Sequence, residues 1–425
     1  MPRPPDILLS VADDQRHTAL GCVGVEPVRT PHLDALAARG CRLTQAYHAG
    51  SPIGAVCMPS RAMLHTGRGP FDLPSELLYD GVPTAGPRTA PTLAALLRAA
   101  GYHTHMVGKW HNMPTALRRD FDAGTAVFEG GMNDQFHFPV VDFDADGEKA
   151  YCLDGVHGTE LFADAAERVI AAHRRGDFGD KPLFLCVAWT APHDPRTTHR
   201  QFHEMYDPAD VELPPNAWPR HPFDNGALSL RDELLAPLPR DADEMRRHVA
   251  DYHAMVTHLD AGVGRVIDAF GHGLAVHTAD HGLAVGQHGL LGKQNLYDHS
   301  IRVPLIMAGP GVPGGLVREG LCYQHDLMPT LCETAGVALP DAVAFESLWP
   351  LVRGDGDGRA FVGSHYTDHQ RCVTDGRRKL IAYADGRRQS FDLAADPWET
   401  NDLGDNADLT EMLGDWQRTV ADPRA

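Results

Sequence analysis

The sequence predicts an α/β protein with a large mixed, mostly parallel sheet flanked by helices and a smaller antiparallel subdomain at the C-terminal end. Short apolar runs alternate with helical patterns along most of the 425 residues, which is typical of a parallel sheet. After the loop Gly354–Gly358 the pattern changes to short strands. We therefore predict a catalytic α/β domain at 1–355 and a C-terminal α+β subdomain at 356–425.

The strands and helices of this prediction come from hydrophobic periodicity. Four apolar runs are predicted as strands of the main sheet: Asp6–Ala12, Tyr102–Val107, Leu183–Trp189 and Leu274–Thr278. Apolar residues at steps of three and four predict long helices at Thr159–Arg175 and Asp243–Phe270. The proline-rich segment Pro208–Pro239 is predicted to be a surface loop. The strands expected in the subdomain are Ala360–Ser364, Arg371–Thr374, Lys379–Tyr383 and Gln389–Leu393.

Composition excludes several classes of protein. The formal net charge of -19 argues against a nucleic-acid binder, which needs a basic face. No apolar run reaches the length of a membrane span. The eight cysteines show no CxxC spacing, and the first residues carry no signal-peptide pattern. We expect a cytoplasmic protein with reduced thiols, whose oligomeric state is left open, and any anionic substrate must be held by a local cationic pocket.

A cysteine stands at the start of a predicted short helix. The run from Cys57 through Pro59 and Arg61 continues to Gly67, which would end the helix. Proline is tolerated in the first turn, and the free N–H groups of a helix start favour an anion. Arg61 follows one turn later with a bidentate donor fork. The stretch therefore suits either a nucleophile beside an oxyanion site or a buried structural cysteine beside a capped helix.

Ionisable residues follow each of the four strands of the main sheet, at the edge where open α/β sheets bind ligands. They are Asp13 and Asp14 after the first strand, Lys109 and His111 after the second, His193 after the third, and Asp280 and His281 after the fourth. Adjacent carboxylates repel one another unless a positive charge lies between them, although a solvated helix cap is the alternative for an Asp-Asp pair alone. Three carboxylates suit Ca²⁺ or Mg²⁺, and the histidine leaves Mn²⁺ or Zn²⁺ open.

Cationic and proton-donating side chains would surround this metal. Such a pocket suits a tetrahedral anion, and the argument rests on the joint placement of its members rather than on any one of them. The residues are Arg61, Lys109, His111, His193 and Lys293.

Taken together, these motifs resemble the sulfatases of the alkaline-phosphatase-like superfamily over most of the chain. The most specific block is Cys57-Met58-Pro59-Ser60-Arg61. The other blocks are Val11–Asp14, Gly101–Thr104 with Gly108–His111, Thr278–Gly282 with Gly292-Lys293 and Arg302–Leu305, Ala191–Pro195, and Phe391–Leu403.

The resemblance implies a role for each of these positions. Asp13, Asp14, Asp280 and His281 would bind one divalent metal, with Ca²⁺ favoured and Mg²⁺ or Mn²⁺ possible, and Cys57, converted to formylglycine by a formylglycine-generating enzyme, would complete the shell. Arg61 would hold the formylglycine, and Lys109 and Lys293 would grip sulfate oxygens. His111 would contact the hydrated aldehyde. His193 would contact the ester oxygen of the leaving group.

Three functions remain after this step. The first is hydrolysis of a small sulfate ester, carbohydrate or aryl, which we favour. The second is hydrolysis of a phosphonate monoester or a phosphodiester at the same site. It stays open because a histidine at the position of His281 is also found in branches of the family that the sequence resembles, including phosphonate monoester hydrolases. The third is a non-catalytic binding protein in which Cys57 stays unmodified, and the intact motif blocks argue against it.

Overall fold

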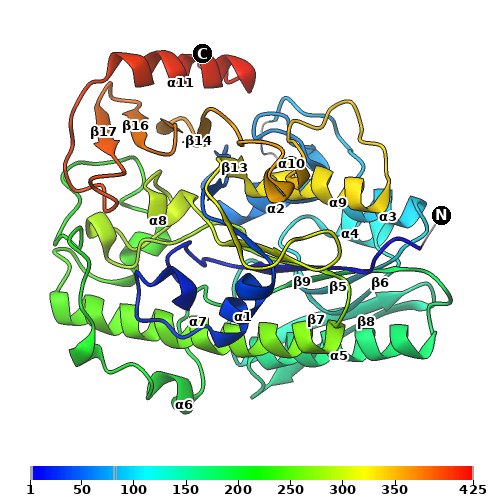
Figure 1. The fold of residues 1–425 in the computed structure, drawn as a ribbon. Coiled ribbons are helices and arrows are strands. Elements are labelled where there is room, and N and C mark those ends of the chain that lie inside the picture. The colour runs from blue at the N-terminus through cyan, green and yellow to red at the C-terminus, as the bar shows by residue number, and fades with distance from the viewer. Residues whose placement is uncertain (1–2, 80–81, 83, 424–425) are drawn as a thin grey trace.

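A ten-stranded mixed sheet forms the centre of the computed structural model, which describes residues 3–79, 82 and 84–423 (Figure 1). Within that part of the chain the strand order is β12-β2-β11-β10-β1-β9-β5-β6-β7-β8. The strands are β1 (Ile7–Ala12), β2 (Cys41–Leu43), β5 (His103–Lys109), β6 (Ala123–Phe128), β7 (His137–Asp144), β8 (Gly147–Asp154), β9 (Leu183–Ala188), β10 (Leu274–Ala279), β11 (Leu305–Ala308) and β12 (Leu316–Arg318).

The middle of this sheet is parallel and buried. Strands β10, β1, β9, β5 and β6 pair in parallel, and every residue of β1, β9 and β10 is buried. Helices cover both faces, which explains why these strands read as uninterrupted apolar runs. All four strands predicted for the main sheet are confirmed. Their register aligns Val11 with Thr278 and with Ala188, so the residues that follow each strand meet at one edge.

The outer strands of the sheet are mostly antiparallel. Strands β7 and β8 form a hairpin whose side chains alternate between buried and exposed on β7, and β8 is largely exposed. The sequence prediction did not include this hairpin. Its runs mix charged and apolar residues, so they lack the continuous apolar signal of the central strands.

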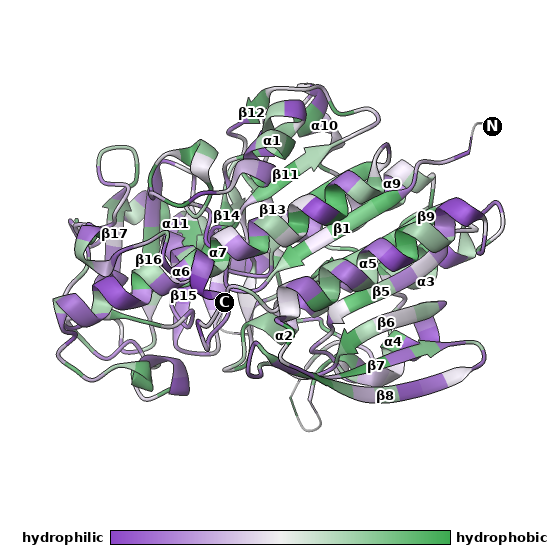
Figure 2. Cartoon of the chain, turned by 90° about the horizontal axis from the view of Figure 1, so that it is seen from below, coloured by the Kyte–Doolittle hydropathy of each residue, from purple (hydrophilic) through white to green (hydrophobic). Residues whose placement is uncertain are grey.

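Helices form a layer on each face of the sheet (Figure 1). Below it in Figure 1 lie α1 (Pro31–Arg39), α5 (Gly158–Arg175) and α7 (Ala242–Phe270), and above it lie α2 (Cys57–Thr66), α3 (Leu93–Ala99), α4 (Pro114–Asp120) and α9 (Leu327–Ala335). The two long predicted helices are confirmed, and the apolar stripe of α7 is buried along its length. Figure 2 shows the green central strands behind α5 and α7. None of the helices in the described residues is long and apolar enough to span a membrane.

The fold also contains a second sheet, which has five strands. Its strand order is β17-β16-β15-β14-β4, and α11 (Ala407–Thr419) lies over it in Figure 1. The four strands predicted for the C-terminal region are confirmed as β14 (Val362–Tyr366), β15 (Gln370–Thr374), β16 (Arg378–Tyr383) and β17 (Arg388–Asp392). The fifth strand, β4 (Gly50–Ser51), comes from the segment that leads into α2. The domain boundary at residue 355 stays a prediction. Residues 1–2 of the first predicted domain and residues 424–425 of the second lie outside the described residues.

The remaining elements are short. They are β3 (Ala46–Tyr47), β13 (Cys322–Tyr323), α6 (Arg200–His203), α8 (Asp298–Ile301) and α10 (Trp349–Arg353), together with several 3₁₀ turns. Two of those turns lie inside the segment Pro208–Pro239, which is irregular as predicted. It is not wholly at the surface, because Asp232 and Glu233 are buried.

A buried lysine connects the second sheet to the main domain. Lys379 of β16 contacts Asp298 of α8 at 2.9 Å and Glu399 at 2.8 Å, and its side chain is fully buried. An ion pair of this kind is weakly stabilising as a whole, but the loss of one partner is strongly destabilising.

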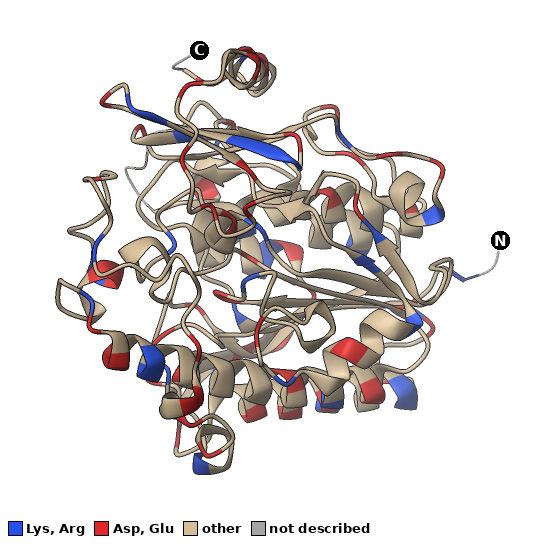
Figure 3. Cartoon of the chain, turned by 60° about the vertical axis from the view of Figure 1, so that its left-hand side comes forward, with Lys and Arg blue, Asp and Glu red and all other residues tan. Residues whose placement is uncertain are grey.

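Both signs of charge are scattered along the outer sides of α5 and α7, the lower helices in Figure 3.

We expect Leu409→Ala to destabilise the protein by about 2–5 kcal/mol, because Leu409 is a buried leucine of the cluster between α11 and the second sheet and its truncation leaves a cavity. Urea denaturation measures this loss. The exposed Glu411 on the same helix is the control, and Glu411→Ala should change the free energy of unfolding by no more than about 0.5 kcal/mol. Equal effects of the two variants would contradict the packing role of α11.

Candidate active site

The residues that follow the parallel strands meet at the carboxyl edge of the main sheet. Asp13 and Asp14 follow β1, Asp280 and His281 follow β10, and the backbone N–H of Asp280 donates to the carbonyl of Ala12 at 3.0 Å. Lys109 is the last residue of β5, and His193 lies shortly after β9. This shared site is the arrangement that the strand-end pattern predicted.

Cys57 is the first residue of α2, as its sequence predicted. Every residue of this helix is buried, and its C-terminal Gly67 adopts the left-handed conformation with φ 65°. The Cys57 Sγ atom lies 3.0 Å from His281 Nε2 and 3.5 Å from Asp13 Oδ1. The Ser60 hydroxyl donates to the Asp280 carbonyl at 2.6 Å, so the first turn of α2 is tied to the end of β10.

Four side chains could share one cation at the start of α2. Ligand atoms of Asp13, Cys57, Asp280 and His281 all lie within 4.8 Å of one another, and all four residues are buried. Asp14 adds Oδ2, which is buried and has no hydrogen-bond partner among the described residues. Buried oxygens left unsatisfied in this way fit a missing positive partner. The donor set of three carboxylates and one imidazole suits a divalent cation.

Each of the three carboxylates also has its own buried cationic side chain. Lys109 bonds to Asp13, and Lys293 Nζ donates to Asp14 Oδ1 at 2.9 Å. Arg61 Nε donates to Asp280 Oδ2 at 3.0 Å, and Arg61 Nη1 donates to the carbonyl of Lys109 at 2.9 Å.

The pKa shifts follow from this balance of burial and charge. Burial alone would raise the pKa of Asp13, but Lys109, His193, Lys293 and Arg61 outweigh it and hold the pKa well below the usual range. Burial, reinforced by Asp13, raises the pKa of the Cys57 thiol well above the usual value. An unmodified Cys57 thus stays a neutral thiol at pH 7 and is a poor nucleophile.

Two histidines face the entrance of the site. His193 Nδ1 donates to the carbonyl of Asp194 at 2.7 Å, and His193 Nε2 lies 3.9 Å from Asp14 Oδ2. His111 Nε2 is 3.2 Å from the Tyr79 hydroxyl, and burial together with Lys109 lowers the pKa of His111 well below its ordinary value. Both histidines, with Cys57 and Lys293, line a cavity of about 450 Å³.

The structure thus brings together all ten residues singled out from the sequence: Asp13, Asp14, Cys57, Arg61, Lys109, His111, His193, Asp280, His281 and Lys293. Arg61 contacts Asp280 and the carbonyl of Lys109, and its expected role of holding the formylglycine stays a prediction. The roles of the ten residues stay predictions.

Sequence reasoning missed other residues of the site. Tyr79 contacts His111, and Asp232 lines the same cavity from the segment predicted as a surface loop. Burial would raise the pKa of Asp232, but Lys293 and other partners lower it to about 2. No local pattern marks these positions, because their role depends on where an irregular segment folds back.

Comparison with known families agrees with this geometry. A model described as Sulfatase matches residues 5–337, and a model of the C-terminal region of N-sulphoglucosamine sulphohydrolase matches residues 286–424. The chain belongs to the sulfatase family. The resemblance inferred from the motif blocks is confirmed.

Sequence relatives of this sulfatase include an ulvan-active sulfatase of Formosa agariphila and a choline-sulfatase of Rhizobium meliloti. The first is 27% identical over 95% of this chain and 77% of the relative. The second is 28% identical over 95% of this chain and 83% of the relative. Relatives along nearly the whole chain are thus named sulfatases, and this sulfatase is a sulfuric ester hydrolase.

Solved structures confirm the alkaline-phosphatase-like fold predicted for this sulfatase. One is of a protein in complex with its substrate D-glucosamine-2-N,6-O-disulfate, with TM-score 0.78, 20% identity and 99% coverage of both chains. Another is the phosphonate monoester hydrolase of Agrobacterium radiobacter, with TM-score 0.75, 21% identity and coverage of 99% of this chain and 95% of that one.

We expect Arg61→Gln to lower the free energy of unfolding by about 3–5 kcal/mol, because it leaves the fully buried Asp280 carboxylate without its cationic partner. Chemical denaturation of the protein as isolated measures the effect. Arg265, which pairs with Asp164 and Glu167 at the surface, is the matched control, and Arg265→Gln should cost no more than about 1 kcal/mol. A loss for Arg61→Gln as small as that of the control would show that the buried pair does not stabilise the fold.

Proposed function

We propose that this sulfatase hydrolyses small sulfate esters, carbohydrate or aryl, with a formylglycine derived from Cys57 and one divalent cation. The proposal rests on one observation above all. Cys57 lies at the start of a buried helix, with its Sγ atom among potential ligand atoms of Asp13, Asp280 and His281 that lie within 4.8 Å of one another.

Asp13, Asp14, Asp280 and His281 would hold the cation, together with the modified residue 57. Ca²⁺ is favoured because carboxylate oxygens dominate the donor set, with Mg²⁺ and Mn²⁺ as alternatives. A bound divalent cation supplies positive charge that lowers the pKa of an oxygen nucleophile beside it.

A formylglycine at position 57, made by a formylglycine-generating enzyme, would supply an aldehyde hydrate with two hydroxyls on one carbon. One hydroxyl would attack sulfur as the S–O bond to the leaving group breaks, and the other would expel sulfate by cleavage of its C–O bond to residue 57. The pKa of the unmodified Cys57 thiol is raised far above neutral pH, which favours a modified residue over a thiolate as the nucleophile.

The other residues bind the sulfate group and handle protons. Lys109 and Lys293 bring two buried positive charges to the site and would bind the sulfate oxygens. Arg61 positions Asp280. His193 holds its Nδ1–H against the Asp194 carbonyl, so in the doubly protonated ring Nε2 can give a proton to the leaving oxygen. His111, a neutral imidazole by its lowered pKa, would contact the hydrate of residue 57.

A phosphonate monoester hydrolase or phosphodiesterase is the second candidate. A tetrahedral phosphorus anion presents the same kind of oxygens to Lys109 and Lys293, and the fold is shared with a phosphonate monoester hydrolase. The family membership favours the sulfate ester.

Paired kinetics with an aryl sulfate and the matching aryl phosphonate test the proposal. We expect kcat/KM to be higher for the sulfate, and Cys57→Ala to remove turnover of both substrates, because the nucleophile is then absent. Mass spectrometry of the peptide that carries residue 57, from protein made in its native host, should show the aldehyde in place of the thiol.

Cys186, which is buried in β9 and is not a member of the ligand cluster, is the matched control for the loss of a buried thiol. Cys186→Ala should retain turnover. An intact thiol at position 57 in active protein would contradict the formylglycine, and a higher kcat/KM for the phosphonate would select the second candidate.

Removal of the metal gives a separate prediction. Dialysis against a chelator should abolish turnover, and added Ca²⁺ should restore it better than Mg²⁺ or Mn²⁺. Asp14→Asn should lower the metal content measured by elemental analysis, because it removes a buried carboxylate that faces the cluster. Asp164→Asn, at the surface of α5, is the control and should leave the metal content unchanged. Full activity in the chelated protein would exclude the cation from the reaction.

A further inference from the structure

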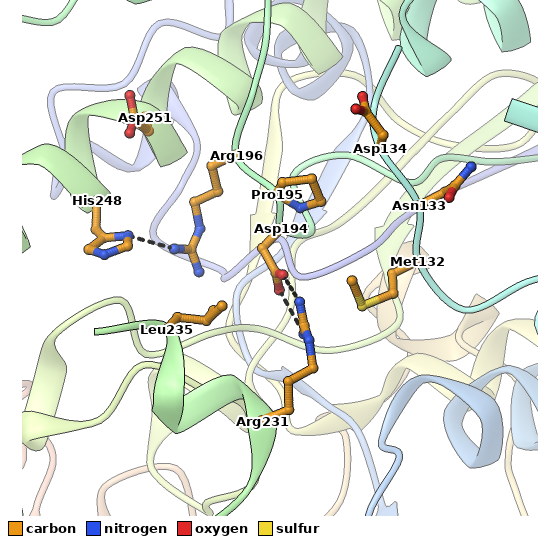
Figure 4. Close-up of a pocket in the computed structure, with 10 residues that line it drawn as sticks. All are labelled: Met132, Asn133, Asp134, Asp194, Pro195, Arg196, Arg231, Leu235, His248 and Asp251. Carbon is orange, nitrogen blue, oxygen red and sulfur yellow. Dashed lines mark hydrogen bonds and ion pairs between the residues drawn. The ribbon is translucent and has the colours of Figure 1, made fainter. Parts of the chain in front are cut away.

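A second cavity adjoins the active site on the side of His193. It has a volume of about 470 Å³, and Figure 4 shows the residues that line it. Met132 and Arg231 belong to the walls of both cavities, and Asp194 follows the catalytic candidate His193 directly. Because the proposed function assigns His193 to the leaving-group oxygen, the second cavity lies where the rest of a substrate would extend.

Arg231 is already neutralised within this wall. Its guanidinium pairs with both carboxylate oxygens of Asp194, and it also contacts Asp232 at 2.9 Å. Figure 4 shows the paired contact with Asp194. These two carboxylates balance the positive charge of Arg231, so we do not expect Arg231 to bind an anionic ligand.

Arg196 differs from Arg231 because no carboxylate among the described residues forms an ion pair with it. Its side chain is buried, with 8% of the residue exposed, and its Nη1 donates to His248 Nδ1 at 3.2 Å. Burial and neighbouring arginines, Arg196 first among them, lower the pKa of His248 to about 4, so the ring is neutral and accepts this bond. This contact brings no negative charge to Arg196, and Asp194 and Asp251 act on Arg196 only at longer range, without an ion pair to it among the described residues.

The free atoms of Arg196 form one edge of the guanidinium. Nε and Nη2 are buried, and neither has a hydrogen-bond partner among the described residues. These two N–H groups point in parallel and match the two oxygens of a carboxylate or sulfate. A buried charged donor without a partner costs free energy, and an anion that enters the cavity would offset that cost.

None of the nearby acidic side chains accepts a hydrogen bond from Nε or Nη2 of Arg196 among the described residues. Asp251 pairs with His203 at 3.1 Å, and in Figure 4 its carboxylate points away from Arg196. Asp134 is exposed at the rim. Asp194 faces Arg231.

We propose that the second cavity binds a further anionic group of the substrate, a carboxylate or a second sulfate, through Arg196. The inference rests on the proposed function and narrows its substrate class to sulfate esters that carry a second negative charge on the leaving group. Arg196 is then a specificity residue and takes no part in the cleavage itself.

The test compares three hexose sulfates: a monosulfate, the same sugar with a second sulfate, and the corresponding hexuronic acid monosulfate. The measured quantity is the ratio of kcat/KM for each dianionic sugar to that for the monosulfate. We expect at least one ratio well above one in the native protein, and Arg196→Gln should lower that ratio about tenfold to a hundredfold, mainly through KM. The dianionic sugar with the higher ratio shows whether the cavity binds the carboxylate or the second sulfate.

A second variant tests the same inference in case Arg196→Gln does not fold. Leu235 lines only the second cavity, so Leu235→Glu keeps Arg196 and adds a negative charge to the wall near it. It should lower the same ratio. Arg247, on the same helix as His248 but exposed and outside the cavity lining, is the charge control, and Arg247→Gln should change the ratio less than twofold.

The outcomes separate this inference from the proposed function. Native ratios near one for both sugars would overturn the inference, as would ratios that Arg196→Gln and Leu235→Glu leave unchanged. In either case hydrolysis of the monosulfate would leave the proposed function standing. A native protein that hydrolyses none of the three sulfates would overturn the proposed function and the inference with it.

Discussion

Mutual repulsion among three buried carboxylates is the constraint on which the rest of the structure depends. Asp13, Asp14 and Asp280 lie at the ends of two neighbouring parallel strands, with almost no exposure to water. Each is paired with its own lysine or arginine, yet Oδ2 of Asp14 has no hydrogen-bond partner in the part of the chain that the structure describes. The surroundings therefore compensate the charge almost fully and leave room for one more positive group.

The fold supplies this compensation from distant parts of the chain. The parallel register of β1 and β10 sets the carboxylates side by side, and α2 carries Cys57 and Arg61 to them on a single turn. The segment before α2 forms β4 of the second sheet, and the buried Lys379 ties that sheet to α8. The second sheet thus connects directly to the segment that places Cys57, although it lies outside the sheet that carries the ligands.

The chemistry and the selectivity proposed for this sulfatase depend on different parts of the structure. The ligand cluster of Asp13, Cys57, Asp280 and His281 is built from strand ends and the start of a helix, elements that a parallel sheet holds rigidly. Both cavities are lined largely by irregular segments, which include Met132 and Arg231, and binding residues there can vary without disturbing the sheet. Arg196 lies in the wall of the second cavity.

The sequence by itself determined the central strands, the long helices and the ten residues of the inner site, because apolar runs and the side chains that follow them are local patterns and parallel strands bring their carboxyl ends to one edge. Only the tertiary structure decided the β7–β8 hairpin, whose mixed runs carry no clear period, and the pairing of β4 with β14. It also decided that Arg61 pairs with Asp280, that Asp232 is buried beside Lys293, and that Nε and Nη2 of Arg196 have no hydrogen-bond partner among the described residues. Those facts depend on distances between segments far apart in the chain, which no local pattern encodes.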